Sequence, residues 1–289
     1  MLNEELVVNF TPTGMIPTKE MTPHVPLSVT EIVEDVLAAC ETGITLVHLH
    51  ARDPETDAPS YKKELYSKII GGIRKYQPNL VICVSLSGRN FKELNQRADP
   101  LYLEGRLKPD MGSLTLSSLN FNKVASINTP QMIQDLAAIM KEKGIVPELE
   151  VFDIGMINYA HYLEKKNLIS PPFYFNLLLG NIACAQADMM QAGIMIRELP
   201  KDSTWSLAGI GNAQLKMNSL AISFGGGVRV GLEDNIWYDT GRTKLARNLD
   251  LLERIHVIAK ANSRSIMSPE KFRQKMQLEK GDGHYGRAV

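Results

Sequence analysis

The stretch SVTEIVEDVLAACETGITLVHLH, residues 28–50, contains the pattern that decides the fold. Ser28 with Glu31 three residues later forms a capping box, which marks the start of a helix, and Gly43 marks the end of that helix. The apolar run that follows, residues 44–50, is typical of a buried strand. A helix that leads directly into such a strand predicts an α/β protein.

The same alternation continues along the chain. Residues 128–144 repeat the helical design, with Pro130 in the first turn and Gly144 at the end. Eight runs have the character of strands: 5–10, 44–50, 80–85, 111–116, 146–152, 173–179, 203–209 and 227–231. Eight strands in β-then-α order, without a Pro/Ser/Gly-rich linker, favour one (β/α)₈ TIM barrel over an open doubly wound sheet.

We therefore expect a single barrel domain over residues 1–278 and a polar, mobile C-terminal tail over residues 279–289. In such barrels the chemistry sits at the C-terminal ends of the strands. Candidate functional residues are accordingly sought where each predicted strand ends.

The composition limits the class of protein. Hydrophobic residues make up 44% and charged residues 22%, and Lys plus Arg equal Asp plus Glu at 32 each. This balance argues against a bulk nucleic-acid or anionic-membrane binder. No apolar run has the length of a membrane span, and the first residues lack a signal-peptide pattern. Three distant cysteines (Cys40, Cys83 and Cys184) indicate reduced thiols in a cytoplasmic protein.

Two histidines end the second predicted strand. His48 and His50 lie two residues apart, so their side chains share one face of the strand. Two buried imidazoles are costly unless their nitrogens have partners. Either a metal ion or a hydrogen-bonded pair of core histidines would supply these partners. A catalytic zinc site needs three protein ligands, and two histidines with one glutamate are an accepted set.

A suitable carboxylate follows the last predicted strand, in the stretch GGGVRVGLEDN at residues 225–235. Strands one and eight are neighbours in a closed barrel and strand two lies next to strand one, so Glu233 can reach His48 and His50. The alternative is that Glu233 and Asp234 cap the following helix. The spacing alone leaves both interpretations open.

Further polar residues face the predicted barrel interior. Glu148 and Glu150 share one strand face, and buried carboxylates need a partner such as Arg229, unless one of them lies at the bottom rim. Ser85 and Ser113 place hydroxyls at the ends of strands three and four. These hydroxyls could bind a substrate carboxylate or be ordinary turn residues.

Together these segments resemble one family, the β-keto acid cleavage enzymes (3-keto-5-aminohexanoate cleavage enzyme-like). The resemblance spans about residues 6–278 and is carried by HLHARDP at 48–54, PELEVFD and GM within 147–156, GIG at 209–211 and GGGVRVGLEDN. The resemblance implies a (β/α)₈ fold, a divalent metal that is usually zinc, and often a homotetramer. It also implies a retro-Claisen reaction of a β-keto acid with acetyl-CoA, which yields acetoacetate and a new acyl-CoA.

The resemblance also implies roles for individual residues. His48, His50 and Glu233 match the metal ligands, and Asp234 matches the base. Arg229 and Glu150 match the residues that orient and tune this base. Ser85 and Ser113 fall where family members hold the substrate carboxylate.

Three departures from the family pattern concern the substrate. Family members that act on an amino-bearing keto acid have a glutamate shortly after the first strand, where this chain has Ile16. A glycine-rich turn is replaced by SLSGR at residues 85–89, and a GT pair by Ser117 and Ser118. Ile16 offers an apolar wall, so we expect a substrate whose far end is neutral and carries no amino group.

Two competing functions remain at this stage. A metal-dependent aldolase or lyase that needs no CoA would use the same metal and base. A barrel without catalytic activity that serves as a binding module is disfavoured, because such a costly polar cluster is intact.

Overall fold

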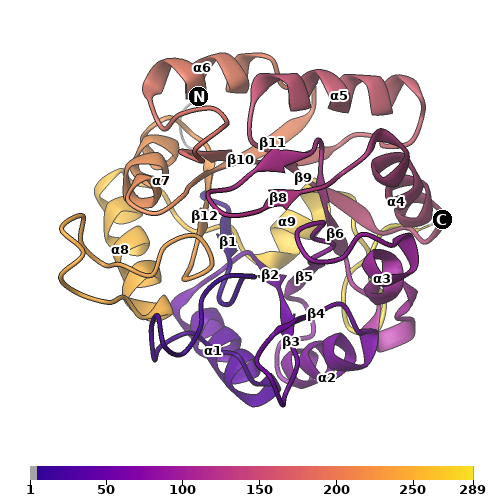
Figure 1. Cartoon of the computed structure of the whole chain (residues 1–289), viewed down its shortest axis with the longest axis horizontal. Helices are drawn as coiled ribbons and strands as arrows, with labels where there is room; N and C mark the ends of the chain where they lie inside the picture. The colour runs from indigo at the N-terminus through magenta and orange to yellow at the C-terminus, as the bar shows by residue number, and fades with distance from the viewer. Residues whose placement is uncertain (1–4, 289) are drawn as a thin grey trace.

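Each predicted strand segment contributes one strand to a closed, parallel barrel (Figure 1). The computed structural model describes residues 5–288. Around the barrel the strands follow the order β1-β12-β11-β10-β9-β6-β5-β2. Their bounds are β1 Val8–Phe10, β2 Leu46–Leu49, β5 Val81–Val84, β6 Met111–Thr115, β9 Val146–Val151, β10 Phe173–Leu179, β11 Ser203–Gly209 and β12 Gly227–Val230. The expected single-domain barrel is therefore confirmed, and β1 lies between β12 and β2 as required for the candidate site.

Helices follow the strands and surround the barrel (Figure 1). They are α1 Val29–Thr42, α2 Lys63–Arg74, α3 Leu94–Ala98, α4 Pro130–Glu142, α5 Ile154–Lys165, α6 Met189–Arg197, α7 Ala213–Ser223, α8 Asn248–Ala261 and α9 Pro269–Lys275, with 3₁₀ turns at Asp99–Tyr102 and Gly105–Leu107. Two short hairpins lie in loops at the C-terminal ends of strands: β3 Ala51–Arg52 with β4 Pro59–Ser60, and β7 Leu119–Asn120 with β8 Ala125–Ser126.

The ends of α1 agree with the sequence pattern. The Glu31 N–H donates to Ser28 Oγ (3.2 Å), and the Ser28 N–H donates to Glu31 Oε2 (3.0 Å), which completes the capping box. Gly43 ends the helix with φ = +111°, a conformation that favours glycine. The strand with both histidines starts directly afterwards, so the cap and the glycine set where β2 begins.

The barrel interior changes from apolar to polar along the strands. Near the strand starts, an apolar layer packs against Phe272 of α9 and Met276 just after this helix, which closes that end of the barrel. This layer consists of Val7, Leu46, Val81, Met111, Val146 and Tyr174. Because side chains alternate along a strand, the inward-facing residues further along each strand form layers that lie closer to the other, open end. The titratable residues are therefore collected near the C-terminal ends of the strands.

The C-terminal segment, which we expected to be mobile, is instead packed onto the closed end of the barrel. Tyr285 is buried, and the Gly286 N–H donates to the buried Asp110 carboxylate (3.1 Å). Arg287 donates to the backbone carbonyls of Met276 (3.0 Å) and Pro172 (2.7 Å). A polar, glycine-rich composition did not reveal these partners, because they are a buried carboxylate and backbone carbonyls that only the fold brings to this segment.

Within the described residues, the helices are too short or too polar to cross a lipid bilayer.

Candidate active site

His48 and His50 lie side by side at the open end of the barrel. Both side chains point inward from the end of β2 and are buried, with His48 only 1% exposed. Their Nε2 atoms are 3.1 Å apart, and His50 Nε2 lies 3.2 Å from Glu233 Oε1. The structure thus brings together the three residues that the sequence suggested as metal ligands.

Glu233 reaches this position through the packing of two loops. The loop after β12 carries Glu233, and the Glu233 N–H donates to the Thr11 carbonyl (3.2 Å) just beyond β1. Gly14 packs against Glu233: a Cβ at Gly14 would lie 2.6 Å from Glu233 Cγ, and Gly14 has φ = +70°. Only glycine fits such a close approach without strain. Helix α8 begins at Asn248, so Glu233 and Asp234 do not cap it.

The donor set fits a divalent cation. Glu233 Oε2 is buried and has no hydrogen-bond partner among the described residues. The ligand atoms around a tetrahedral Zn²⁺ with bonds of about 2.0–2.1 Å would lie about 3.3 Å apart, close to the 3.1 Å and 3.2 Å observed here. A cation between the Glu233 carboxylate and the two facing Nε2 atoms would satisfy both nitrogens. It would also give a partner to a carboxylate whose Oε1 accepts from Arg229 but whose Oε2 has no partner within residues 5–288.

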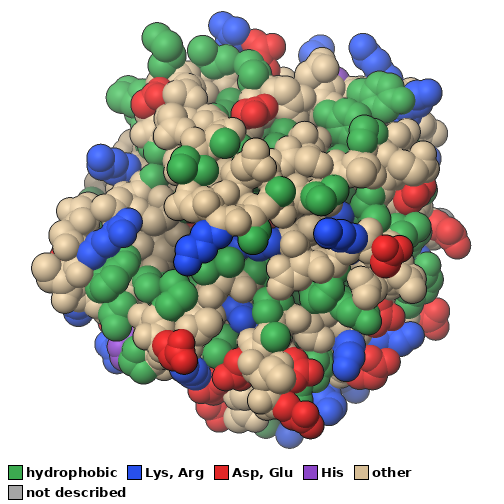
Figure 2. Space-filling model, viewed as in Figure 1, with side chains coloured by type: hydrophobic (Ala, Val, Ile, Leu, Met, Phe, Trp, Pro, Cys, Tyr) green, Lys and Arg blue, Asp and Glu red, His purple; other side chains and the backbone are tan. Residues whose placement is uncertain are grey.

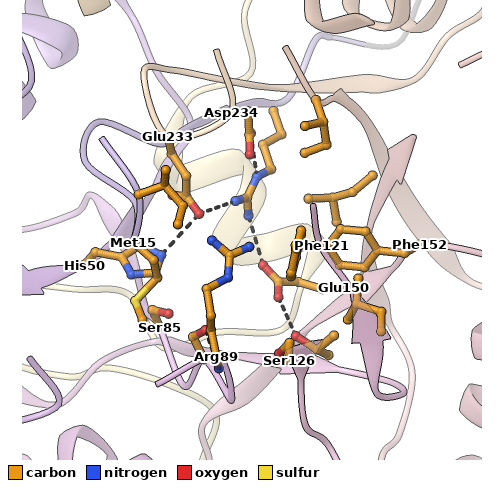
Figure 3. Close-up of a pocket in the computed structure, with 17 residues that line it drawn as sticks. Met15, His50, Ser85, Arg89, Phe121, Ser126, Glu150, Phe152, Glu233 and Asp234 are labelled. Carbon is orange, nitrogen blue, oxygen red and sulfur yellow. Dashed lines mark hydrogen bonds and ion pairs between the residues drawn. The ribbon is translucent and has the colours of Figure 1, made fainter. Parts of the chain in front are cut away.

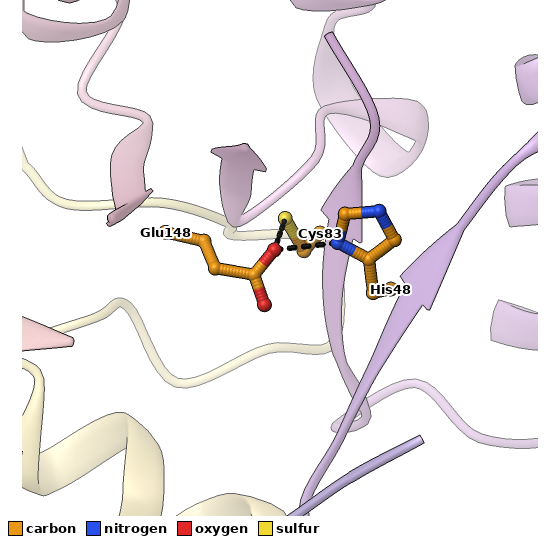
Figure 4. Close-up of side chains that lie close together, drawn as sticks. All are labelled: His48, Cys83 and Glu148. Atoms are coloured by element: carbon orange, nitrogen blue, oxygen red, sulfur yellow. Dashed lines mark hydrogen bonds and ion pairs between the residues drawn. The ribbon is translucent and has the colours of Figure 1, made fainter. Parts of the chain in front are cut away.

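A second cluster, of His48, Cys83 and Glu148, lies deeper in the barrel (Figure 4). Glu148 is fully buried, and its two oxygens already have four donors: His48 Nδ1, Cys83 Sγ, Asn9 Nδ2 and Asn176 Nδ2. A carboxylate satisfied in this way needs no cation. By holding Nδ1 of His48, Glu148 leaves Nε2 facing the open end of the barrel, as outer-shell carboxylates do for metal-binding histidines.

The electrostatics of the cluster follow from burial and charge. Burial disfavours the charged forms of both His48 and Glu148, but their mutual attraction outweighs it, so the pKa of His48 is raised to about 9 and that of Glu148 is lowered to about 2. Burial dominates at His50, whose pKa is lowered to about 4. The thiol of Cys83 has a pKa well above its usual range because it is buried beside Glu148.

Arg229 connects three carboxylates at the open end (Figure 3). Its Nε donates to Asp234 Oδ2 (3.0 Å), Nη2 to Glu233 Oε1 (2.7 Å) and Nη1 to Glu150 Oε1 (3.1 Å). The guanidinium is almost completely buried, so these charge-assisted bonds fix the relative positions of the three acids. Glu150 also accepts a hydrogen bond from Thr115 Oγ1 (2.8 Å).

Asp234 differs from the neighbouring Glu233 in the direction of its pKa shift. Burial, together with the adjacent Glu233 charge, raises the pKa of Asp234 to about 6, despite the opposing effect of Arg229. A carboxylate with such a pKa is a stronger base than an exposed one and is still ionised at neutral pH. Asp234 also lines the cavity at the barrel mouth, where it is available to a bound molecule.

This cavity, at the open end of the barrel, is lined by residues from several of the β–α loops (Figure 3). Ser85 and Ile16 line it together with His50 and the three acids, and Ile16 is 49% exposed. Ser113 does not line it; its hydroxyl accepts a hydrogen bond from the Leu86 N–H (3.0 Å). Ser113 lies two residues before Thr115 on β6, so it sits one layer deeper in the barrel.

Sequence reasoning missed several residues of this site. The sequence did not distinguish the role of Glu148 from that of Glu150. It also did not identify Arg89, Phe121 and Phe152 as residues that line the cavity. Their positions in the sequence could have indicated Arg89, Phe121 and Phe152. Each of them lies in a loop directly after a barrel strand, or just beyond the short strand that such a loop contains.

Comparison with known proteins agrees with this geometry. Residues 5–278 match the family model described as beta-keto acid cleavage enzyme. A 3-keto-5-aminohexanoate cleavage enzyme of Fusobacterium nucleatum is 35% identical over 279 residues, which cover 96% of this chain and 99% of that protein. A 3-oxoadipate:acetyl-CoA acetyltransferase of Cupriavidus necator is 32% identical over 280 residues, which cover 96% of this chain and 96% of that protein.

Among solved structures, the apo form of ObcA resembles the fold with a TM-score of 0.78 at 18% identity. The similarity covers 89% of this chain and 66% of the ObcA chain, slightly less than two thirds of its length. It supports the barrel fold alone. The family match over nearly the whole chain and the relatives above 30% identity go further. On this evidence the chain belongs to the β-keto acid cleavage enzyme family.

Proposed function

We propose that this protein is a metal-dependent β-keto acid cleavage enzyme. It condenses a β-keto acid with acetyl-CoA and cleaves the product to acetoacetate and a new acyl-CoA. The observation that carries the proposal is the arrangement in which Arg229 holds Asp234, Glu233 and Glu150 beside His50. The name of the Cupriavidus necator relative, which contains acetyl-CoA, supports the choice of co-substrate.

His48, His50 and Glu233 would hold the metal, which we propose to be Zn²⁺. When bound, such a cation acts as a Lewis acid and stabilises negative charge that develops on the keto oxygen. The free Glu233 oxygen and the facing histidine nitrogens support this ligand set. Glu148 keeps His48 in the required tautomer and orientation.

Asp234 is the proposed base. It takes a proton from the carbon between the ketone and the carboxylate of the substrate, and its raised pKa suits this transfer near neutral pH. Arg229 holds the Asp234 carboxylate in place, and Glu150 fixes Arg229 from the other side. The resulting carbanion attacks the thioester carbonyl of acetyl-CoA. The C–S bond of acetyl-CoA breaks, and the released CoA thiolate adds to the original keto carbonyl. The C–C bond between this carbonyl and the α-carbon then breaks to give the new acyl-CoA, and the acetoacetate carbanion takes the proton back from Asp234.

The lining of the cavity supports the expected substrate. Ser85 is available to the substrate carboxylate, whereas the buried Ser113 acts on the loop backbone instead. Met15 and Ile16 provide an apolar wall without a carboxylate. We therefore propose a β-keto acid whose far end carries no ammonium group and is neutral, either aliphatic or weakly polar.

The assembly and location are also proposals. An apolar surface on α5 and α6, which lie next to each other in Figure 1, supports a homotetramer. It consists of Ile154, Tyr162, Met189, Met190 and Ile194, all exposed. The three cysteines are free thiols in the structure, which supports a reducing, cytoplasmic location.

The alternative function is a CoA-independent metal-dependent aldolase or lyase on the same barrel. The decisive experiment is a screen of zinc-loaded enzyme against a panel of β-keto acids, with and without acetyl-CoA, in which acetoacetate and acyl-CoA are measured. We expect turnover only with acetyl-CoA and formation of both products in equal amounts. Cleavage that proceeds without acetyl-CoA would favour the aldolase.

A further inference from the structure

Arg89 is a second arginine that lines the cavity, and it has no hydrogen-bond acceptor among the described residues. It follows β5 in the loop that begins at Ser85, and Figure 3 shows its side chain extending toward the middle of the cavity. Its Nε is buried and has no hydrogen-bond partner, and no ion pair with Arg89 is found within residues 5–288. A buried donor without an acceptor is costly, so this arrangement points to a bound partner that accepts from it.

The acids beside the cavity attract Arg89 through space, but they make their hydrogen bonds with Arg229. Arg229 offsets one of the three carboxylates that it contacts, and a divalent cation would offset the other two. Arg97, the next arginine in the same region, donates to the Leu86 carbonyl and to Asn128 Oδ1. Among these arginines, Arg89 is therefore the one for whose N–H groups no acceptor is found within residues 5–288.

Stacking holds the Arg89 guanidinium without using its donors. The guanidinium carbon lies 3.7 Å from the centre of the Phe121 ring. Phe121 in turn makes an edge contact with Phe152, with ring centres 5.8 Å apart. A guanidinium that stacks through its face keeps its in-plane N–H groups free, and these match a carboxylate in a bidentate manner.

The backbone of the loop is fixed as well. Arg97 holds the Leu86 carbonyl from one side, and the Ser113 hydroxyl accepts from the Leu86 N–H on the other. Gly88 is so closely packed that a Cβ there would lie 2.5 Å from the Ile127 carbonyl oxygen. Arg89 therefore starts from a rigid backbone position, as a recognition residue requires.

We infer that Arg89 binds a carboxylate of the β-keto acid through the in-plane N–H groups of its guanidinium. This inference rests on the proposed function and names a specificity residue for it. Every β-keto acid has a carboxylate next to the reacting carbon, and this group is one possible ligand of Arg89. Ser85 lines the same cavity and offers a second donor to this carboxylate. A second carboxylate at the far end of the substrate is the other source, and it would replace the neutral far end proposed above. Basic side chains also lie near the middle of this face of the molecule, whereas acidic ones lie mainly toward its edge (Figure 2).

The test compares Arg89→Ala and Arg89→Lys with the wild-type enzyme. The control is Lys123→Ala, which removes a cation that lines the outer groove but not the inner cavity. In Arg89→Ala the KM for 3-oxohexanoate should rise about 10- to 100-fold, the usual effect of a lost charge-assisted hydrogen bond. The KM for acetyl-CoA should not change. Arg89→Lys, or free guanidinium added to Arg89→Ala, should restore part of the loss.

A matched pair of substrates separates the two sources. 3-Oxohexanoate and 3-oxoadipate have the same chain length, but only the second has a terminal carboxylate. Equal losses for both would assign Arg89 to the reacting carboxylate, and a loss confined to 3-oxoadipate would assign it to the terminal one. Either result supports carboxylate recognition by Arg89.

Calorimetric binding of acetoacetate to the zinc-loaded proteins gives a measurement that needs no turnover. A wild-type enzyme that cleaves no β-keto acid would contradict the proposed function and leave this binding test intact. The inference itself is overturned if Arg89→Ala binds acetoacetate as tightly as the wild type and keeps its KM for both keto acids. It is equally overturned if only the KM for acetyl-CoA rises, or if Lys123→Ala causes the same loss.

Discussion

Glu148 decides which nitrogen His48 presents to the open end of the barrel. It occupies Nδ1, so that Nε2 of His48 faces Nε2 of His50 at 3.1 Å. Removing one imidazole leaves too few ligands for a tetrahedral cation. His48→Ala should therefore lose nearly all bound zinc, as measured by metal analysis of the purified protein.

His161→Ala provides the control, because His161 lies on α5, away from the barrel mouth, and its ring nitrogens lie near the Glu198 carbonyl and Glu164. It should keep the wild-type metal content. Wild-type zinc occupancy in His48→Ala would refute the ligand assignment.

Asp234→Asn separates proton transfer from metal binding. An amide cannot accept the proton, while its oxygen can still accept the hydrogen bond from Arg229 Nε. We expect a loss of turnover by roughly two to four orders of magnitude with unchanged metal content and circular dichroism. A near-normal rate would mean that another residue is the base, with Glu150 the next candidate.

Ile16 bears on the selection of the substrate. An ammonium group beside an apolar side chain without a counter-charge costs several kcal/mol, as an order of magnitude for a partly desolvated ion. The wild type should therefore prefer a straight-chain β-keto acid over its amino-terminated analogue in kcat/KM, and Ile16→Glu should reduce or reverse this preference. A wild-type preference for the cationic substrate would show that another acid serves the far end of the pocket.

At the residue scale, the sequence predicted which residues meet but not how deep each lies. Alternation along β9 places Glu148 and Glu150 on one face, yet only the stagger of neighbouring strands puts Glu148 beneath His48 and Glu150 beside Arg229. The same holds for Ser113, which is one layer too deep for the cavity. Arg89 lay in a Ser/Gly loop, where no periodicity indicates direction.

At the element scale, Asn248 ties the first and last parts of the barrel together. At the start of α8 its Oδ1 accepts from the Leu232 N–H (2.9 Å). Its Nδ2 donates to the Pro12 carbonyl (3.0 Å) and to Asp35 Oδ2 on α1 (2.7 Å). The loops after β1 and β12, which carry Ile16 and Glu233, are thereby held to α1 and α8.

Asp35 makes this junction sensitive to pH. Burial raises the pKa of Asp35 to about 6, against a smaller opposing effect of the Asn248 hydrogen bond. Because the folded-state pKa lies above the unfolded one, the neutral carboxyl stabilises the fold below about pH 4, and this stability is lost as the pH rises through 6.

Asp35→Asn keeps an acceptor for Asn248 and cannot ionise. The stability of the variant relative to the wild type should therefore increase between pH 4 and pH 7, by at most about 3 kcal/mol. Urea unfolding at several pH values measures this difference, with the exposed Glu34→Gln on the same helix as the control. A difference that stays constant with pH would contradict the role of Asp35.

The elements themselves were predictable to different degrees. The eight barrel strands and the caps of α1 and α4 follow from local signals: apolar runs, Ser28 with Glu31, and Pro130 after Thr129. The hairpins β3-β4 and β7-β8 could not be predicted from the sequence, because each has strands of only two residues in a polar loop. Yet the β7-β8 hairpin carries Phe121, which supports Arg89.

At the scale of the whole molecule, the two ends of the barrel carry different tasks. The open end holds the carboxylates, the histidines and the cavity. At the closed end, Asp110 is fully buried and pairs with Arg273 (2.8 Å) and Arg74 (3.1 Å). The C-terminal segment completes this closed end, since Arg74 stacks on Tyr285 at 3.2 Å from the ring centre. Changes there should affect stability and leave catalysis unaffected.

Tyr285→Ala tests this division. The side chain is buried, and its loss would leave a cavity and uncover the Asp110–Arg74 pair, so the free energy of unfolding should fall by about 3 kcal/mol. The kcat/KM should stay within about twofold of the wild type below the unfolding temperature, since the reacting groups lie at the other end of the strands. Denaturant unfolding and steady-state kinetics on the same preparation measure both quantities. Tyr102→Ala, at an exposed tyrosine, is the matched control and should change neither. An unchanged unfolding free energy in Tyr285→Ala would show that the C-terminal segment does not close the barrel, and a selective loss of kcat/KM would show that the two ends are coupled.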